Sequence, residues 1–119
     1  MHEVNTFTAT LCVGLREGYT DVVRPMADAI EVVQGYCNEV GLCVTCTPTT
    51  FVYSQRPETP HGQEPGLLIG FVNYPRFPSQ PDDIRKHAEA LGAAIKQKLR
   101  QNRVSVVYPD VTRMVGEKQ

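Results

Sequence analysis

The sequence predicts an α+β domain of the ferredoxin-like type, in which a four-stranded antiparallel sheet carries two helices on one face. Four segments have the composition and alternation of strands, and two have the spacing of amphipathic helices. These segments follow one another in the order strand, helix, strand, strand, helix, strand. The chain has 119 residues, which suits one domain and leaves little room for two. We therefore expect a single α+β domain over residues 1–119.

The first strand and the first helix follow from two different hydrophobic periods. Apolar residues alternate with small or mildly polar ones over residues 7–15, which predicts a strand with one buried face. Over residues 22–40 the apolar residues are spaced by three and four, which is typical of a helix that buries one stripe. Pro25 is tolerated only in a first turn, so we expect the helix to begin within residues 21–24. Gly41 should end it in a left-handed conformation.

Two further strands are expected in the middle of the chain, separated by a long connection. Residues 42–54 are rich in Val, Thr, Phe and Tyr, but Pro48 cannot donate to a ladder, which predicts an edge strand or a bulge. Residues 55–65 contain three prolines and a glycine and should form a loop. Residues 66–73 are apolar on both faces, which indicates a central strand.

The second helix and the last strand complete the pattern. Ser79 with Asp82 three positions later resembles a capping box, so the helix should start there. Residues 104–108 read as the fourth strand, and residues 110–115 as its extension after a kink at Pro109. The stripe expected to face the core on the second helix consists of Ile84, Ala88, Leu91, Ile95 and Leu99.

The expected strand order is fourth, first, third, second, with right-handed crossovers that place both helices on one face. The other face should carry Thr6, Thr8, Thr10, Cys12, Cys43, Thr45 and either Leu68 and Val72 or their alternates. Such a face is too apolar for an ordinary solvated surface, so we expect self-association through it. The alternatives are that this face holds a small ligand, that the long loop covers it, or that it is the Thr-rich face of a single-layer sheet exposed to water.

Composition excludes several classes of partner. The net charge of −1 does not indicate a nucleic-acid-binding surface, and no apolar run approaches the roughly 20 residues that cross a bilayer. The first ten residues contain no Lys or Arg, so they lack the start of a secretory signal. We therefore expect a cytoplasmic protein that contacts no membrane, with nucleic acid as an unfavoured partner.

Cysteine and histidine do not form a recognisable metal or catalytic pattern. Cys43 and Cys46 form a CxxC, but it lies in a predicted strand, where residues three apart face opposite sides and cannot share a metal. The four cysteines are therefore read as small structural residues. His61 stands alone in the long loop beside Glu58 and Glu64, without a placed nucleophile. We expect no metal, no cofactor and no catalytic residue.

The tentative ligand site lies in the segments that follow the first and third strands. Taking these neighbouring strands as parallel brings both segments to one end of the sheet, next to the starts of both helices, where anions are favoured. The alternative is that the residues of both segments stiffen the loops and bind no ligand. The side chains proposed to meet there, and to bind a small anionic ligand such as a nucleotide, are Arg16, Glu17, Tyr19, Asn73, Tyr74 and Arg76.

Three stretches of the chain resemble segments of small uncharacterised proteins from tailed-phage and prophage genomes. They are GLREGYT at residues 14–20, EVGLCVT at 39–45 followed by TPT at 47–49, and GFVNYPRFP at 70–78. The resemblance spans most of the chain. It implies a phage-encoded accessory protein that acts in the host cytoplasm, and it assigns no catalytic residue.

The leading functional expectation is therefore a non-enzymatic, homo-oligomeric accessory or binding protein. The alternative is a small enzyme, or a protein that binds a small anionic metabolite or nucleotide, using the same loops with His61 or Glu17 as proton carrier. A nucleic-acid-binding module is a third possibility, although the expected sheet face lacks the exposed aromatic residues that stack on bases.

Overall fold

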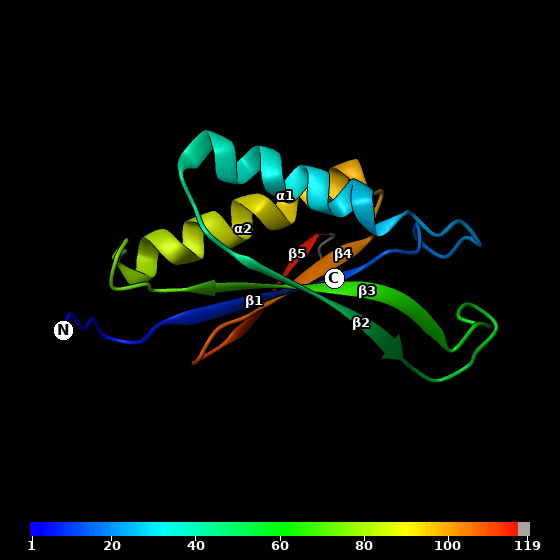
Figure 1. Cartoon of the computed structure of the whole chain (residues 1–119). Coiled ribbons are helices and arrows are strands. Elements are labelled where there is room, and N and C mark those ends of the chain that lie inside the picture. The colour runs from blue at the N-terminus through cyan, green and yellow to red at the C-terminus, as the bar shows by residue number, and fades with distance from the viewer. Residues whose placement is uncertain (117–119) are drawn as a thin grey trace.

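The structure, a computed structural model, describes residues 1–116 and contains two helices and a five-stranded sheet (Figure 1). The first six elements follow the predicted order, and a fifth strand is added after them. The elements are β1 (Thr8–Gly14), α1 (Met26–Val40), β2 (Thr45–Val52), β3 (Gln63–Val72), α2 (Pro81–Lys98), β4 (Arg103–Val107) and β5 (Thr112–Gly116).

The strand order is β2-β3-β1-β4-β5, which confirms β1 and β3 as inner strands and β2, with Pro48, as an edge. The prediction of four strands was wrong by one. Residues 110–115 do not extend β4, because the chain reverses after Tyr108, whose N–H donates to the Val111 carbonyl at 2.9 Å. The residues beyond this turn pair antiparallel with β4 as β5 and become the second edge.

The direction of β3 corrects a second expectation. β1 and β3 are antiparallel, with Thr8 opposite Val72 and Gly14 opposite Gly66, which agrees with the predicted antiparallel sheet but not with the parallel pair assumed for the ligand site. The reason is topological: β3 returns from β2 through a hairpin, and the β1–α1–β2 crossover makes β2 run in the same direction as β1. The ends of β1 and β2 therefore share one end of the sheet, and the end of β3 lies at the other.

Both helices cover one face of the sheet, as predicted (Figure 1). The core is made of alternate residues of β1, β3 and β4 packed against α2, with α1 alongside α2. All five stripe residues expected on α2 are buried, and Leu91 and Ile95 have no exposed surface. Burial of side chains of this size typically stabilises a fold by about 1.5–3 kcal/mol each.

The helix α1 begins later than its hydrophobic pattern indicates. Residues 22–24 run antiparallel to the chain after β1, where the Arg24 N–H donates to the Leu15 carbonyl at 2.7 Å, and Pro25 becomes the N-cap. Within the helix, Ile30 is 38% exposed, while Ala29 is buried. The helix ends as expected at Gly41, whose φ of 75° is left-handed.

The predicted capping box at the start of α2 is absent. Gln80 is the N-cap and its side chain makes no capping hydrogen bond. Ser79 is instead held by Asn73, whose Oδ1 accepts from the Ser79 N–H at 2.8 Å. The side chain of Asn73, which follows β3, therefore holds the segment that leads into α2, and the side chain of Ser79 does not.

The face opposite the helices carries the small and β-branched residues that were expected there. Thr8, Thr10 and Cys12 alternate with the buried residues of β1 and pair through β3 with Val72 and its neighbours. Two apolar residues, Val107 in β4 and Met114 in the added edge strand β5, are 41% and 49% exposed. Cys43 precedes β2 instead of lying within it. Within residues 1–116, neither helix has the length and apolar character needed to cross a bilayer.

Candidate functional site

The two loops proposed to form one site lie at opposite ends of the sheet, because β1 and β3 are antiparallel. Each loop contributes to a different pocket. Arg16 and Tyr19 line one pocket, and Tyr74 and Arg76 line the other. The predicted convergence of the six residues is therefore wrong, although whether any of them binds a ligand remains a prediction.

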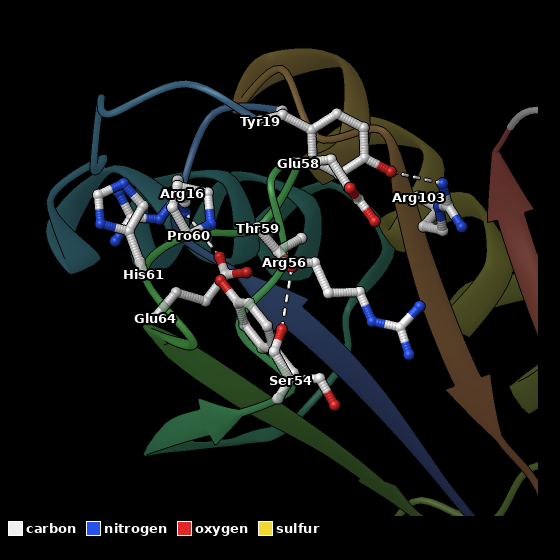
Figure 2. A pocket seen from close by; sticks show the side chains of 12 residues that line it. Arg16, Tyr19, Ser54, Arg56, Glu58, Thr59, Pro60, His61, Glu64 and Arg103 are labelled. Atoms are coloured by element: carbon white, nitrogen blue, oxygen red, sulfur yellow. Dashed lines mark hydrogen bonds between the residues drawn. The ribbon is translucent and has the colours of Figure 1, made fainter.

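The pocket at the Arg16 end, called here the arginine pocket, has a volume of about 520 Å³ (Figure 2). It lies between the β1–α1 loop and the β2–β3 connection, which meet there because β1 and β2 run in the same direction. Arg103 at the start of β4 closes a third side. The lining residues are Arg16, Gly18, Tyr19, Tyr53, Ser54, Arg56, Glu58, Thr59, Pro60, His61, Glu64 and Arg103.

Three arginines from different segments, Arg16, Arg56 and Arg103, line the pocket and give it positive charge. Arg103 donates to the Tyr19 hydroxyl at 3.0 Å, which joins the start of β4 to the β1–α1 loop (Figure 2). The Arg16 Nε is buried without a hydrogen-bond partner, and its NH2 reaches the Gln63 carbonyl at 3.5 Å. Over residues 1–116, none of Arg16, Arg56 and Arg103 forms an ion pair. Their charge is therefore available to an anionic group.

Two carboxylates, Glu58 and Glu64, line the arginine pocket and differ in their hydrogen bonding. Glu64 accepts a hydrogen bond from the backbone N–H of Arg16 at 3.0 Å, which fixes its position on β3. It lies over Gly14, where a Cβ would come within 3.0 Å of the carboxylate carbon, so a side chain at position 14 would displace the Glu64 carboxylate. Glu58 is exposed and its side chain makes no hydrogen bond within the described part of the chain. Glu58 is thus the carboxylate left for a cationic group.

His61 at the rim of the pocket pairs with Asp21 across the two loops. The His61 Nε2 lies 2.7 Å from the Asp21 Oδ1, and 39% and 90% of the two side chains are exposed. A histidine oriented by a carboxylate is an arrangement found in proton-transfer sites. The sequence pattern suggested no partner for His61, because Asp21 is 40 positions away.

The remaining predicted residues have other partners. Glu17 forms an ion pair with Arg24 at 3.5 Å and does not line the arginine pocket. Asn73 is buried and holds its own loop, since its Nδ2 donates to the Asn5 carbonyl at 2.9 Å. In the second pocket, of about 540 Å³, the guanidinium carbon of Arg76 lies 5.5 Å from the centre of the Phe77 ring. None of the described residues that line that pocket carries a carboxylate.

Sequence reasoning missed Tyr53, Arg56 and Arg103 as residues of a site, and noted Glu58 and Glu64 only as neighbours of His61. The available signal was the hairpin between the second and third strands. It places residues 53–62 at the end of the sheet where the first strand also ends. Arg103 carries no comparable signal, because it reaches Tyr19 from 84 positions away.

The cysteines show no chemistry that would add to this site. All four are unpaired thiols, and Cys46 packs towards the core while Cys43 is exposed. Burial raises the pKa of the Cys12, Cys37 and Cys46 thiols, which disfavours the reactive thiolate. No group of three or more potential metal ligands occurs within residues 1–116.

The fold is similar to that of two solved phage structures along almost its whole length. A phage SAM lyase in complex with S-methyl-5'-thioadenosine has a TM-score of 0.75 at 16% sequence identity, covering 98% of this chain and 94% of that chain. A phage SAM lyase in the apo state has a TM-score of 0.73 at 14% identity, covering 95% and 90% of the two chains. No protein-family model and no curated protein matches the sequence.

These similarities show a shared fold and support the resemblance to phage proteins. They also overturn the leading functional expectation. The chain was predicted to be a non-enzymatic accessory protein, whereas both neighbours are lyases, so that prediction is wrong. The alternative of a small enzyme that uses a small-molecule pocket fits them better.

Proposed function

We propose that this protein is a lyase that cleaves S-adenosylmethionine (SAM) in the arginine pocket and releases S-methyl-5'-thioadenosine. The observation that carries the proposal is the set of groups in that pocket. Aromatic rings, guanidinium groups that form no ion pair within residues 1–116 and the exposed carboxylate of Glu58 line one space of about 520 Å³, within the usual range for small-molecule sites. The shared fold with two SAM lyases supports SAM as the ligand that these groups would bind.

Each part of SAM has a complementary group in the pocket. The adenine ring can stack on Tyr19 or Tyr53, the two aromatic residues of the lining. The α-carboxylate can take hydrogen bonds from Arg56 and Arg103, which pair with no carboxylate in the described residues. The α-ammonium group can pair with Glu58. Among the described residues, no carboxylate lines the second pocket to pair with this cation.

The proposed reaction breaks the bond between the sulfonium sulfur and the γ-carbon of the methionine part. The bonding electron pair goes to sulfur, which becomes the neutral thioether of S-methyl-5'-thioadenosine. In the same step, either the carboxylate oxygen of the four-carbon fragment attacks the γ-carbon and closes a lactone, with no proton transfer, or a base removes a β-proton and the fragment becomes an alkene. Both routes balance without an oxidant, a reductant or water.

The charge change in this reaction gives the arginines a second role. Sulfur is positive in the substrate and loses that charge in the transition state. Guanidinium groups near sulfur therefore raise the free energy of the bound substrate relative to the transition state, which is the differential binding that accelerates a reaction. We assign this role to Arg16, whose buried Nε has no hydrogen-bond partner within residues 1–116.

The test is to incubate the purified protein with SAM and to measure S-methyl-5'-thioadenosine and the four-carbon product by mass spectrometry. We expect Arg56→Ala to lower kcat/KM by about tenfold or more, as removal of a charged hydrogen bond commonly does. Arg76→Ala is the matched control, because Arg76 is also exposed and lies in the second pocket. Its activity should equal that of the wild type.

Two outcomes would contradict the proposal. One is the absence of S-methyl-5'-thioadenosine above the rate of a heat-inactivated sample. The other is an equal loss in Arg76→Ala and Arg56→Ala, which would show that the loss of activity is not specific to the arginine pocket. A lactone or an alkene as the second product distinguishes the two routes.

We further propose that the protein is phage-encoded, acts in the host cytoplasm, and self-associates through the open face of the sheet. The origin and location are supported by the phage neighbours. Self-association is supported by the exposed apolar residues of that face, among them Val72, Val107 and Met114.

A further inference from the structure

We propose that His61 and Asp21 are positioning residues that fasten residues 54–61, called here the pocket loop, across the arginine pocket. The proposal rests on the proposed function only for the identity of the ligand. The pair joins the β2–β3 connection to the β1–α1 loop at 2.7 Å. Residues of both segments line the pocket, and Figure 2 shows His61 at its edge.

The pocket loop is a preformed unit. Arg56 and Thr59 exchange backbone hydrogen bonds of 3.2 and 2.9 Å, and the Thr59 hydroxyl donates to the Ser54 carbonyl at 3.0 Å. The Gln55 side chain donates to the Pro60 carbonyl at 3.3 Å. These bonds begin and end within the loop. They fix its internal shape and leave its placement over the pocket to other contacts.

The base of the loop is a tight closure. The Tyr53 N–H donates to the Gly62 carbonyl at 2.8 Å, and Gly62 has a φ of 69°. A Cβ at this position would lie 2.6 Å from Gln55 Cγ. The chain therefore turns sharply at Gly62, immediately after His61, and this point is where the rigid loop can pivot on the sheet.

Beyond that base, one polar contact holds the loop to the rest of the protein. Within residues 1–116, the contact between His61 and Asp21 is the hydrogen bond that links residues 54–61 to a segment outside 53–62. The charged groups that line the same pocket near His61 are Arg16, Glu58 and Glu64. None of them is bonded to the imidazole.

This contact matters because the pocket loop carries Arg56 and Glu58. Neither side chain makes a hydrogen bond within the described residues, so the loop alone sets their position. A loop released at His61 would move both charges away from Tyr19 and Arg103 on the facing side. The consequence is weaker binding of a charged ligand with little change in the fold.

The first test uses the free protein. Amide hydrogen exchange of residues 54–61 should rise by roughly two- to fivefold in His61→Ala and in Asp21→Ala, the range for one exposed ion pair. The double variant should exchange no faster than either single variant, because both remove the same contact. The exchanged pair, His61→Asp with Asp21→His, should restore slow exchange. His87→Ala is the control, since His87 bonds Tyr36 between the helices at 2.9 Å.

The second test measures the dissociation constant of S-methyl-5'-thioadenosine in the same variants. We expect it to rise by about the factor seen in exchange and to recover in the exchanged pair, with kcat changed less than KM. Unchanged exchange in both single variants, or additive effects in the double variant, would overturn the positioning role. If exchange responds as expected but the wild type does not bind this ligand, the proposed function fails and the positioning role stands.

Discussion

At the scale of single residues, the best-defined polar cluster lies away from either pocket, where the β4–β5 turn meets α2. The Tyr108 hydroxyl donates to Glu89 Oε2 at 2.6 Å, and Arg113 donates to the same oxygen at 2.7 Å. The guanidinium carbon of Arg85 lies 4.5 Å from the centre of the Tyr108 ring and 5.0 Å from that of Phe7. The cluster binds the added strand β5 to the second helix.

The pKa values of this cluster are shifted in directions that predict its pH dependence. Burial, followed by the bond to Glu89, raises the pKa of Tyr108, so the cluster is stabilising below the ordinary tyrosine pKa of about 10 and loses that contribution as the pH rises above it. The bond from Tyr108 lowers the pKa of Glu89. That contribution is present above the ordinary glutamate pKa and is lost as the pH falls.

Tyr108→Phe should lower the free energy of unfolding by about 1 kcal/mol at pH 7, because the Glu89 carboxylate loses one of its two donors. The variant should also lose less stability than the wild type between about pH 9 and pH 11, since it lacks the buried phenol. Urea unfolding at several pH values measures both effects. Tyr19→Phe, which removes an exposed phenol, is the control. Parallel pH profiles for wild type and Tyr108→Phe would contradict the assignment.

At the scale of elements, α1 illustrates what a local pattern can and cannot predict. Its end at Gly41 follows from the sequence, because a left-handed residue at that position is a local requirement. Its start does not, because the pairing of Arg24 with Leu15 is made between separate segments and displaces the first turn to Met26. The stripe on α2 was predictable for the same reason as Gly41: no long-range pairing competes with its 3.6-residue period.

Two glycines of α1 should respond oppositely to alanine. At Gly35 a Cβ would meet no atom within 4 Å, so Gly35→Ala should raise the free energy of unfolding by roughly 0.5–1 kcal/mol through helix propensity. At Gly41, with φ of 75°, alanine should lower it by about 1 kcal/mol through backbone strain. Chemical denaturation of the two variants checks the signs. A stabilised Gly41→Ala would contradict the left-handed end of the helix.

At the scale of the whole molecule, the class and strand order were predictable, but the site was not. Two-faced apolarity and Pro48 correctly placed the inner and edge strands. The predicted location of the site depended on the direction of β3 relative to β1. Because that direction was wrong, Tyr74 and Arg76 lie at the end of the sheet opposite to Arg16. No periodicity in the sequence contains that information, because direction follows from how the hairpin and the crossover combine.

The open sheet face gives the whole-molecule prediction. If it carries self-association, sedimentation at micromolar concentration should show a dimer or larger species, and Met114→Lys should shift it towards the monomer. Val22→Lys is the matched control, because Val22 is 50% exposed, similar to Met114 at 49%, but lies in the β1–α1 loop. A monomeric wild type would contradict self-association.

The antiparallel pairing of β1 and β3 also favours attachment of the protein to a dye or a surface at a point far from the arginine pocket. Its longest dimension is 53 Å, with the arginine pocket at one end and Cys43 at the other. Cys43 is the exposed thiol, whereas the other three cysteines are partly buried with raised pKa values. A maleimide dye or surface tether should therefore attach at Cys43 and leave the arginine pocket facing solution. The native chain then needs no engineered attachment site for single-molecule binding measurements.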